Sequence, residues 1–386
     1  MTSFVTPSTP QEARQRLEHQ YGRPSADAMS PYERVLRAIQ RQTPDRVPFD
    51  YWAVPETQAR LMDYLQARDE EELLRLLGVD CRIVSPDLIG PSRQELPDGT
   101  FLDRWGSHRR KVSNEFSTYE EYASFPLAEA QSAAEVESWP RWPKTEGWRW
   151  DSLTAKIDAL NREVRYPIRY DVGGIFESSW ALYGLDRFLV DLLEKPEVPC
   201  AIMDCYTDVM IANVHALMRA AQGKIDWVYT YYDEAIQNGL LMSPRLWRKY
   251  ILPRHQRLNA VIKSYGLKII YHSCGAIYPL IGALIDDMNI DVLNPLQPRA
   301  SMMDMARIKE EFGGRIAFHG AIDLQHTMPH GSPQDVVDEV RARCQILGQG
   351  GGYLCTTAHY IQNDVPIENI LALYLAPRGT DYARHR

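Results

Sequence analysis

Two side chains that could bind a metal ion follow a strand-like segment in the second half of the sequence. Residues 267–271 form an apolar run after Gly266, and His272 and Cys274 follow directly. Side chains alternate across a strand, so residues two apart point to the same side. Imidazole and thiolate are ligands that Zn²⁺ accepts. The spacing predicts half of a zinc site, although a His and a Cys packed in a core would give the same pattern.

Strands and helices alternate through most of the chain, which predicts how this pair is positioned. Eight strand-like runs are present, at residues 47–52, 80–86, 167–172, 227–233, 267–274, 292–297, 316–323 and 352–358. Helical patterns separate the later runs. Eight alternating strands predict an α/β fold of the (β/α)₈ TIM barrel type. A doubly wound sheet is the alternative, but it usually has fewer strands.

The sequence predicts an N-terminal extension, a barrel domain and an insertion within that domain. Residues 1–44 predict a polar, helical N-terminal extension, and residues 45–386 the barrel. An insertion is expected after the second strand, at about residues 99–150, because a segment rich in Pro and Trp interrupts the alternation there. Within it, residues 101–112 alternate like a hairpin.

Composition narrows the classes of partner. The chain has 386 residues and a net charge of -8, and its Lys and Arg residues are dispersed, which argues against nucleic acid. No apolar run approaches the ~20 residues of a membrane span, and the N-terminus has no signal-peptide pattern. The six cysteines lack disulfide-scaffold spacing. We expect a cytoplasmic protein with a small-molecule substrate and reduced thiols.

Polar side chains crowd the predicted carboxyl ends of the strands, where barrel enzymes carry their active groups. For a third metal ligand, His359 at the end of the last strand is favoured, and Cys355 inside that strand is the alternative. Two roles are expected for His319 with equal weight: a hydrogen bond within the rim formed by the strand ends, or a contact with the substrate. The candidates for catalysis and substrate binding are Glu177, Tyr231, Tyr232, Asp233, Asn294, Gln297, His319 and Asp323.

Several segments together resemble the uroporphyrinogen decarboxylase superfamily, and more closely its zinc-dependent branch, the methylcobamide:coenzyme M methyltransferases. The resemblance covers nearly the whole chain from about Met29. His272-Ser-Cys-Gly275 is similar to the His-x-Cys-Gly motif of the zinc branch. The other segments that carry the resemblance are residues 30–39, 44–48, 173–177, 185–191, 232–234, 237–244, 318–323, 351–353 and 365–370.

The resemblance implies a (β/α)₈ barrel in which His272, Cys274 and a third residue hold Zn²⁺. The family's third ligand is a Cys, and its position falls on His359 here. The Arg-rich N-terminal signature of true uroporphyrinogen decarboxylases is absent, because the first strand contains Phe49-Asp-Tyr-Trp52 instead. We therefore do not expect decarboxylation of a porphyrinogen.

The same resemblance implies a methyltransferase that moves a methyl group between a corrinoid (methylcobalamin) and a small substrate. That substrate would be a thiol, or a methoxylated or methylated compound in a demethylation system. The corrinoid would be carried by a partner protein, and a homodimer is possible. Asp233, Glu177 and Asp323 would orient substrate or move a proton, and Tyr231 or Tyr232 would donate a hydrogen bond. The alternatives are a cofactor-independent decarboxylase or lyase of a small carboxylate, and a non-catalytic corrinoid-binding barrel.

Overall fold

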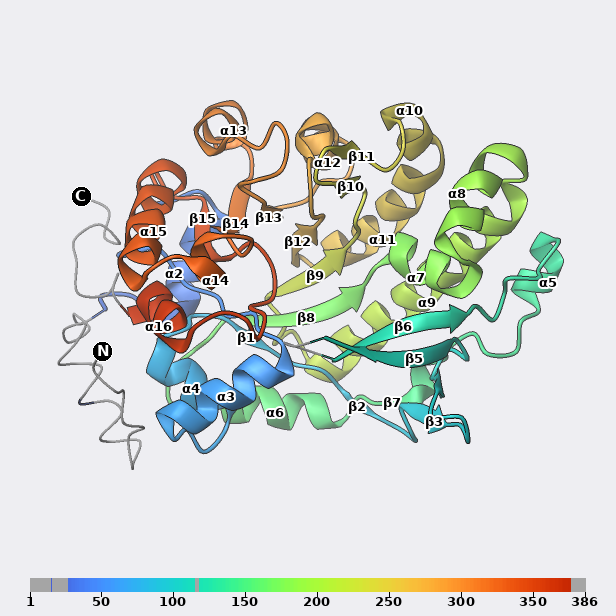
Figure 1. Ribbon diagram of the computed structural model, residues 1–386, viewed down its shortest axis with the longest axis horizontal. Coiled ribbons are helices and arrows are strands. Elements are labelled where there is room, and N and C mark those ends of the chain that lie inside the picture. Colours follow the sequence, from blue (N-terminus) through green and yellow to red (C-terminus); the bar gives the residue numbers. More distant parts are fainter. Residues whose placement is uncertain (1–14, 16–26, 115–117, 376–386) are drawn as a thin grey trace. The chain divides into compact units, whose positions relative to one another are not determined.

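The computed structural model describes residue 15 and residues 27–114 and 118–375 (Figure 1). The chain divides into two compact units. Unit 1 comprises Met1–Arg82, Leu160–Pro167 and Asp291–Arg386, and unit 2 comprises Ile83–Ala159 and Ile168–Ile290. Most of the predicted N-terminal extension, residues 1–14 and 16–26, lies outside the described residues. None of the described helices is both long and apolar enough to cross a membrane.

Three parallel strands form the centre of unit 2: β8 (Ile168–Gly173), β9 (Trp227–Tyr231) and β12 (Lys268–His272). β9 pairs with both of the others, and its Trp227 lies opposite Arg169 on one side and Lys268 on the other. Most residues of these strands are buried, as expected for parallel strands that are covered on both faces. The strands predicted at residues 167–172, 227–233 and 267–274 are confirmed.

Helices of unit 2 follow these strands. α7 (Ile175–Tyr183) and α8 (Leu185–Glu194) lead to α9 (Glu197–Ala221), and the π-helix η2 (Trp247–Ile251) leads to α11 (Leu252–Ser264). α9 was not predicted from the sequence, although it has 25 residues. Its middle contains Cys, Thr, Val and Ile, which are poor helix formers, so burial against its neighbours must stabilise it.

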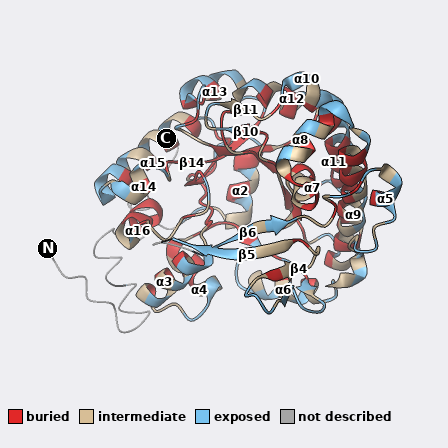
Figure 2. Cartoon of the chain, turned by 45° about the vertical axis from the view of Figure 1, so that its right-hand side comes forward, coloured by how far each residue is buried: buried red, intermediate tan, exposed pale blue. Residues whose placement is uncertain are grey.

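Unit 2 contains a four-stranded antiparallel sheet, of which three strands lie in the predicted insertion, residues 99–150, and the first precedes it. Its strands follow the order β3 (Arg93–Glu95), β4 (Phe101–Asp103), β5 (His108–Ser113) and β6 (Thr118–Ser124). β4 and β5 form the hairpin predicted at residues 101–112. β6 is exposed along most of its length (Figure 2).

Unit 1 contains the parallel strands β13 (Val292–Leu296), β14 (Ala317–Ile322) and β15 (Tyr353–Thr357). In the first predicted strand, residues 47–52, Phe49 forms an isolated parallel bridge to Cys355, and Ala53, just after that strand, forms another to Ile361. The second predicted strand, residues 80–86, is shorter than expected and consists of β1 (Arg82–Ile83). All eight predicted strand positions therefore have extended, paired backbone among the described residues.

Residues 56–77 have a continuous helical pattern in the sequence, but two helices occupy them. α3 (Pro55–Leu65) ends at Gln66, which adopts the left-handed conformation with φ 53°. α4 (Glu70–Leu77) then begins after Asp69, whose carboxylate accepts a hydrogen bond from the Glu72 backbone. A left-handed residue and an N-cap interrupt the helix even though its apolar pattern continues.

Other helices of unit 1 are α2 (Pro31–Ile39), α13 (Met305–Phe312), α14 (Thr327–His330), α15 (Pro333–Leu347) and α16 (Ile367–Leu375). α2 begins at Pro31, directly after its N-cap Ser30. Ser30 and Glu33 form a reciprocal capping box at its first turn.

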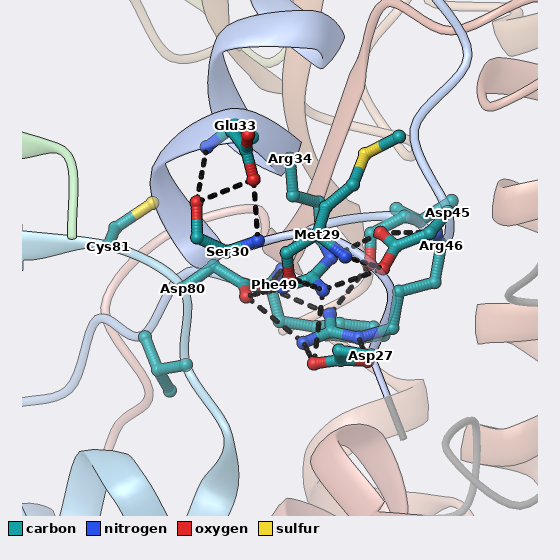
Figure 3. Close-up of polar contacts among 12 residues, drawn as sticks. Asp27, Met29, Ser30, Glu33, Arg34, Asp45, Arg46, Phe49, Asp80 and Cys81 are labelled. Atoms are coloured by element: carbon teal, nitrogen blue, oxygen red, sulfur yellow. Dashed lines mark hydrogen bonds and ion pairs between the residues drawn. The ribbon is translucent and has the colours of Figure 1, made fainter. Parts of the chain in front are cut away.

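A buried ion cluster ties α2 to the segment that precedes β1 (Figure 3). The fully buried Arg34 guanidinium lies 2.6 Å from an Asp80 carboxylate oxygen and 2.7 Å from Asp45. Arg46 binds the other oxygen of Asp80 at 2.8 Å. Burial would raise the pKa of Asp80, but the charges of Arg46 and Arg34 hold it below its usual value. The opposite charges compensate one another. Removing either guanidinium would therefore leave a buried carboxylate charge less compensated and would destabilise the fold.

Replacing Arg34 by Met should lower the free energy of unfolding by about 3–5 kcal/mol, because it leaves the Asp80 charge buried with one guanidinium fewer. Urea-induced unfolding would measure this. Arg68→Met is the control: Arg68 pairs with Glu72 on the surface, and its loss should cost less than about 1 kcal/mol. Equal losses in both variants would contradict the prediction.

Candidate functional site

The loops after β9 and β12 lie side by side and are joined by hydrogen bonds. The backbone N–H of Tyr232 donates to the carbonyl of His272 at 2.8 Å, which extends the strand pairing by one residue. The backbone N–H of Cys274 then donates to a carboxylate oxygen of Asp233 at 2.9 Å. Asp233 is thereby held beside the two candidate metal ligands of unit 2.

Gly275 lets the second loop turn away at this point. Its φ is +88°, in the left-handed region, and an added Cβ would lie 2.6 Å from the carbonyl oxygen of Ile236. The next residue, Ala276, donates its backbone N–H to the same oxygen at 2.9 Å. Any side chain at position 275 would separate the loops, so the turn at this glycine has a steric cause.

His272 and Cys274 are close enough to bind one ion. The His272 Nε2 and the Cys274 Sγ lie 3.4 Å apart. The usual Zn–N and Zn–S lengths with a tetrahedral angle place these atoms about 3.6 Å apart. Burial would lower the pKa of His272, but hydrogen bonds with Asp233 and Cys274 raise it well above its usual value. The i, i+2 spacing therefore brings the two donor atoms together, at a separation that one zinc ion could bridge.

His272, Cys274 and His359 are a group of described side chains that could hold a metal ion. His359 follows β15 and is exposed. The alternative ligand, Cys355, lies within β15, is fully buried and contacts Cys344 of α15. This contact, together with burial, raises the pKa of the Cys344 thiol well above its usual value. Cys355 thus packs against a helix of its own unit.

Glu177 lies in the first turn of α7 and shares a hydrogen bond with Asp233. Burial and the neighbouring charge of Asp233 raise the pKa of Glu177 to about 7. The helix can begin this close to β9 because its N-cap is Gly174, where a Cβ would lie 2.3 Å from the carbonyl oxygen of Tyr231. Two carboxyl groups that share a proton near neutral pH can accept or donate one.

Tyr231 and Tyr232 point to opposite sides, as neighbours at the end of a strand do. Tyr231 is half-buried, its ring lies 5.6 Å from that of Tyr229, and burial raises its pKa. Tyr232 is fully buried, with its ring 5.3 Å from Tyr271 and 3.8 Å from His255. These positions leave Tyr231 as the candidate for a substrate contact and favour packing for Tyr232.

A buried polar network in unit 1 contains His319 and Asn294. The Asn294 amide nitrogen lies 2.6 Å from His319 Nδ1, and His319 Nε2 lies 3.0 Å from a carboxylate oxygen of Asp50. The indole N–H of Trp52 donates to the same carboxylate at 2.7 Å. An amide that donates to Nδ1 leaves Nε2 protonated and donating to Asp50. Of the two roles expected for His319, the structure favours the hydrogen bond within the rim.

Asp323 and Gln297 also follow strands of unit 1, at the ends of β14 and β13. Asp323 is buried, and one of its carboxylate oxygens lies 3.5 Å from a guanidinium nitrogen of Arg299. The other oxygen accepts the backbone N–H of Gln325 at 2.7 Å. Gln297 is half-buried. The pairing of Arg299 with Asp323 was not predicted, because no sequence pattern relates the two positions.

A buried carboxyl group beside Asp233, that of Glu234, was not predicted from the sequence. Glu234 accepts hydrogen bonds on one oxygen from the hydroxyl of Tyr271 at 2.6 Å and from the indole of Trp247 at 2.7 Å. Burial raises the pKa of Glu234 to about 7 and lowers that of the neighbouring His255 to about 3. Glu234 could have been suspected because it follows Asp233 at a strand end. Nothing in the sequence connects His255 to it.

The buried Glu234 predicts a pH-dependent stability. Its folded pKa of about 7 exceeds the ordinary value of 4.5, so the folded protein binds a proton that the unfolded chain releases. The free energy of unfolding should therefore fall by about 3 kcal/mol as the pH rises from about 4.5 to 7, then level off. Glu234→Gln keeps an oxygen acceptor and should lack this contribution in urea unfolding at several pH values. Glu129→Gln, on the surface, should follow the unmodified protein, and identical profiles in all three would contradict the prediction.

The comparison with known proteins identifies the family. Residues 121–378 match the family model described as uroporphyrinogen decarboxylase (URO-D). The chain belongs to the uroporphyrinogen decarboxylase family. The resemblance predicted from the sequence motifs is thus confirmed.

Two similar proteins come from Methanosarcina mazei. A methylated-thiol–coenzyme M methyltransferase is 25% identical over 190 residues, which cover 49% of this chain and 47% of that protein. The chain therefore spans about half the length of the curated relative that it matches. A solved structure, a methyltransferase, is 18% identical with a TM-score of 0.64 and covers 90% of this chain and 98% of its own. This likeness gives the chain an α/β, TIM-barrel-like fold.

Proposed function

We propose that this chain is a zinc-dependent methyltransferase that moves a methyl group between a corrinoid on a separate protein and a small substrate. The substrate would be a thiol, or a methylated or methoxylated compound. The observation that carries the proposal is the His272–Cys274 pair at the end of β12, with its donor atoms 3.4 Å apart and Asp233 beside them. The similarity to a methylated-thiol–coenzyme M methyltransferase supports the same reaction class.

His272, Cys274 and His359 would hold the metal. When bound, a zinc ion with an open position supplies a Lewis acid that lowers the pKa of a thiol or alcohol. The burial of Cys355 against α15 supports His359 as the third ligand. Compared with the thiolate that the family has there, a neutral imidazole leaves the site more positive, which favours binding of an anion.

The protein's own carboxylates would manage the proton. Asp233 is fixed by the Cys274 backbone and shares a hydrogen bond with Glu177. Because the pKa of Glu177 is about 7, its carboxylate can accept the proton of a substrate thiol or hydroxyl at neutral pH. Tyr231 would donate a hydrogen bond to the substrate, and Asp323, with Arg299, would orient it.

We also propose a closed barrel as the domain architecture and a corrinoid-binding protein as the partner. The bridges of Phe49 and Ala53 to the last part of the chain would supply the first strand of a closed (β/α)₈ barrel. Residues 45–386 would form this barrel, residues 1–44 a helical extension and residues 99–150 the insertion. The corrinoid-binding partner rests on the family relationship alone.

Metal analysis of the purified protein tests the ligand set. We expect about one equivalent of zinc per chain, and loss of most of it in Cys274→Ala and in His359→Ala, because a tetrahedral site with an open position depends on three protein ligands. Mass spectrometry of the metal would measure this. Cys355→Ala is the matched control and should keep its zinc. Loss of zinc in the control, with retention in His359→Ala, would make Cys355 the third ligand.

The pH dependence of the reaction tests Glu177. If its carboxylate accepts the substrate proton, kcat/KM should rise with pH through about 7, since the group is protonated below that value. Glu177→Gln should lower kcat/KM by roughly 10²–10⁴-fold and lose this rise. Methyl transfer from methylcobalamin to thiols provides the assay, with Glu129→Gln as a control. A Gln variant that keeps the same pH profile would exclude Glu177 as the base.

A further inference from the structure

Arg104 lies in the turn between β4 and β5 of the insertion, where aromatic side chains surround it (both strands are labelled in Figure 2). Its guanidinium carbon lies 4.3 Å from the ring centre of Trp148 and 5.7 Å from that of Trp105. The residue is half-buried. A guanidinium stacked on an indole keeps its edge, which carries the N–H donors, available for an acceptor.

No oxygen acceptor within the described residues satisfies this edge. Arg104 has neither an ion pair nor a hydrogen bond there. The adjacent Asp103 is already engaged, because one of its oxygens accepts the backbone N–H groups of Trp105 and Ser107. Burial consequently lowers the pKa of Arg104. By contrast, hydrogen bonds to protein oxygen atoms are made by the buried or half-buried Arg34, Arg46, Arg82, Arg109, Arg254 and Arg343.

The same turn lies close to the carboxyl end of β8. The Trp105 ring lies 5.4 Å from the ring of Tyr206, a buried residue of α9. The Tyr206 hydroxyl in turn lies 3.4 Å from where a Cβ of Gly173, the last residue of β8, would be. The charges of Arg104 and Glu177 both act on this hydroxyl. Arg104 and the candidate base Glu177 are therefore both near the hydroxyl of one tyrosine.

We propose that Arg104 binds the carboxylate of a flat aromatic substrate whose ring packs against Trp105 and Tyr206. The fork of the guanidinium matches a carboxylate in two parallel hydrogen bonds, and the aromatic side chains provide faces for a ring. The carboxylates of Glu177 and Asp233 repel an anion, so the carboxylate end of the substrate would lie at Arg104 and its opposite end at Glu177. The assignment rests on the proposed function and names its substrate class.

Binding of benzoate to the metal-loaded protein tests the assignment without requiring methyl transfer. Isothermal titration calorimetry should show that benzoate binds at least about tenfold more tightly than its neutral analogue benzamide, because only the former offers a charged acceptor. Arg104→Gln should weaken benzoate about tenfold or more and leave benzamide unchanged, and Arg104→Lys should weaken it less. Arg149→Gln, an exposed arginine next to Trp148, is the control and should bind like the unmodified protein.

Three results would overturn the assignment: no binding of benzoate to the unmodified protein at millimolar concentration, equal affinity for benzoate and benzamide, or equal weakening in the Arg104→Gln and Arg149→Gln variants. Cyclohexanecarboxylate, which is not flat, should bind more weakly, and equal affinity would overturn the aromatic part. The comparison of benzoate with benzamide on the unmodified protein holds even if Arg104→Gln does not fold. Zinc content of the same samples separates the two proposals. Full zinc without benzoate binding overturns only this one, and benzoate binding without zinc overturns only the metal site.

Discussion

The hydrogen bond from the Cys274 backbone to the Asp233 carboxylate is the constraint on which the candidate site depends. It joins two loops that leave neighbouring strands, so the side chains at positions 272, 274 and 233 keep fixed separations. Gly275 permits this approach, because a larger residue would collide with Ile236. The site is thus assembled by backbone geometry at the carboxyl ends of parallel strands, before any ligand contributes.

Burial raises the pKa of two carboxyl groups close to Asp233, those of Glu177 and Glu234. Burial is the main cause that raises the pKa of both Glu177 and Glu234 to about 7, and the charge of Asp233 is the second cause for Glu177 but the last for Glu234. Glu234 has its hydrogen bonds on a single oxygen and lies in the core, whereas Glu177 lies at the start of a helix and is half-buried. Under the proposed function, Glu177 would exchange a proton with the substrate, and Glu234 would hold the loop in position.

The sequence predicted the parts of the site that depend on local periodicity. The strand positions, and the meeting of His272 with Cys274, follow from alternation along a single strand. Side chains whose partners come from distant segments could not be predicted in this way. Glu234 with His255, and Asp323 with Arg299, are joined only by tertiary packing. The break between α3 and α4 was missed because a left-handed Gln and an Asp cap leave the apolar pattern unchanged.

The pairing of residues 49–53 with residues 355–374 within unit 1 has a consequence for biosynthesis. The hydroxyl of Tyr374 donates to the carbonyl of Asp50 across 324 positions of sequence, and Phe49 is bridged to Cys355. The segment from Phe49 to Tyr374 must therefore leave the ribosome before these pairings can form, whereas the residues of unit 2 emerge earlier and almost without interruption. During that interval the apolar residues near the N-terminus lack their partners. Chaperone dependence and aggregation during expression should originate in this first segment.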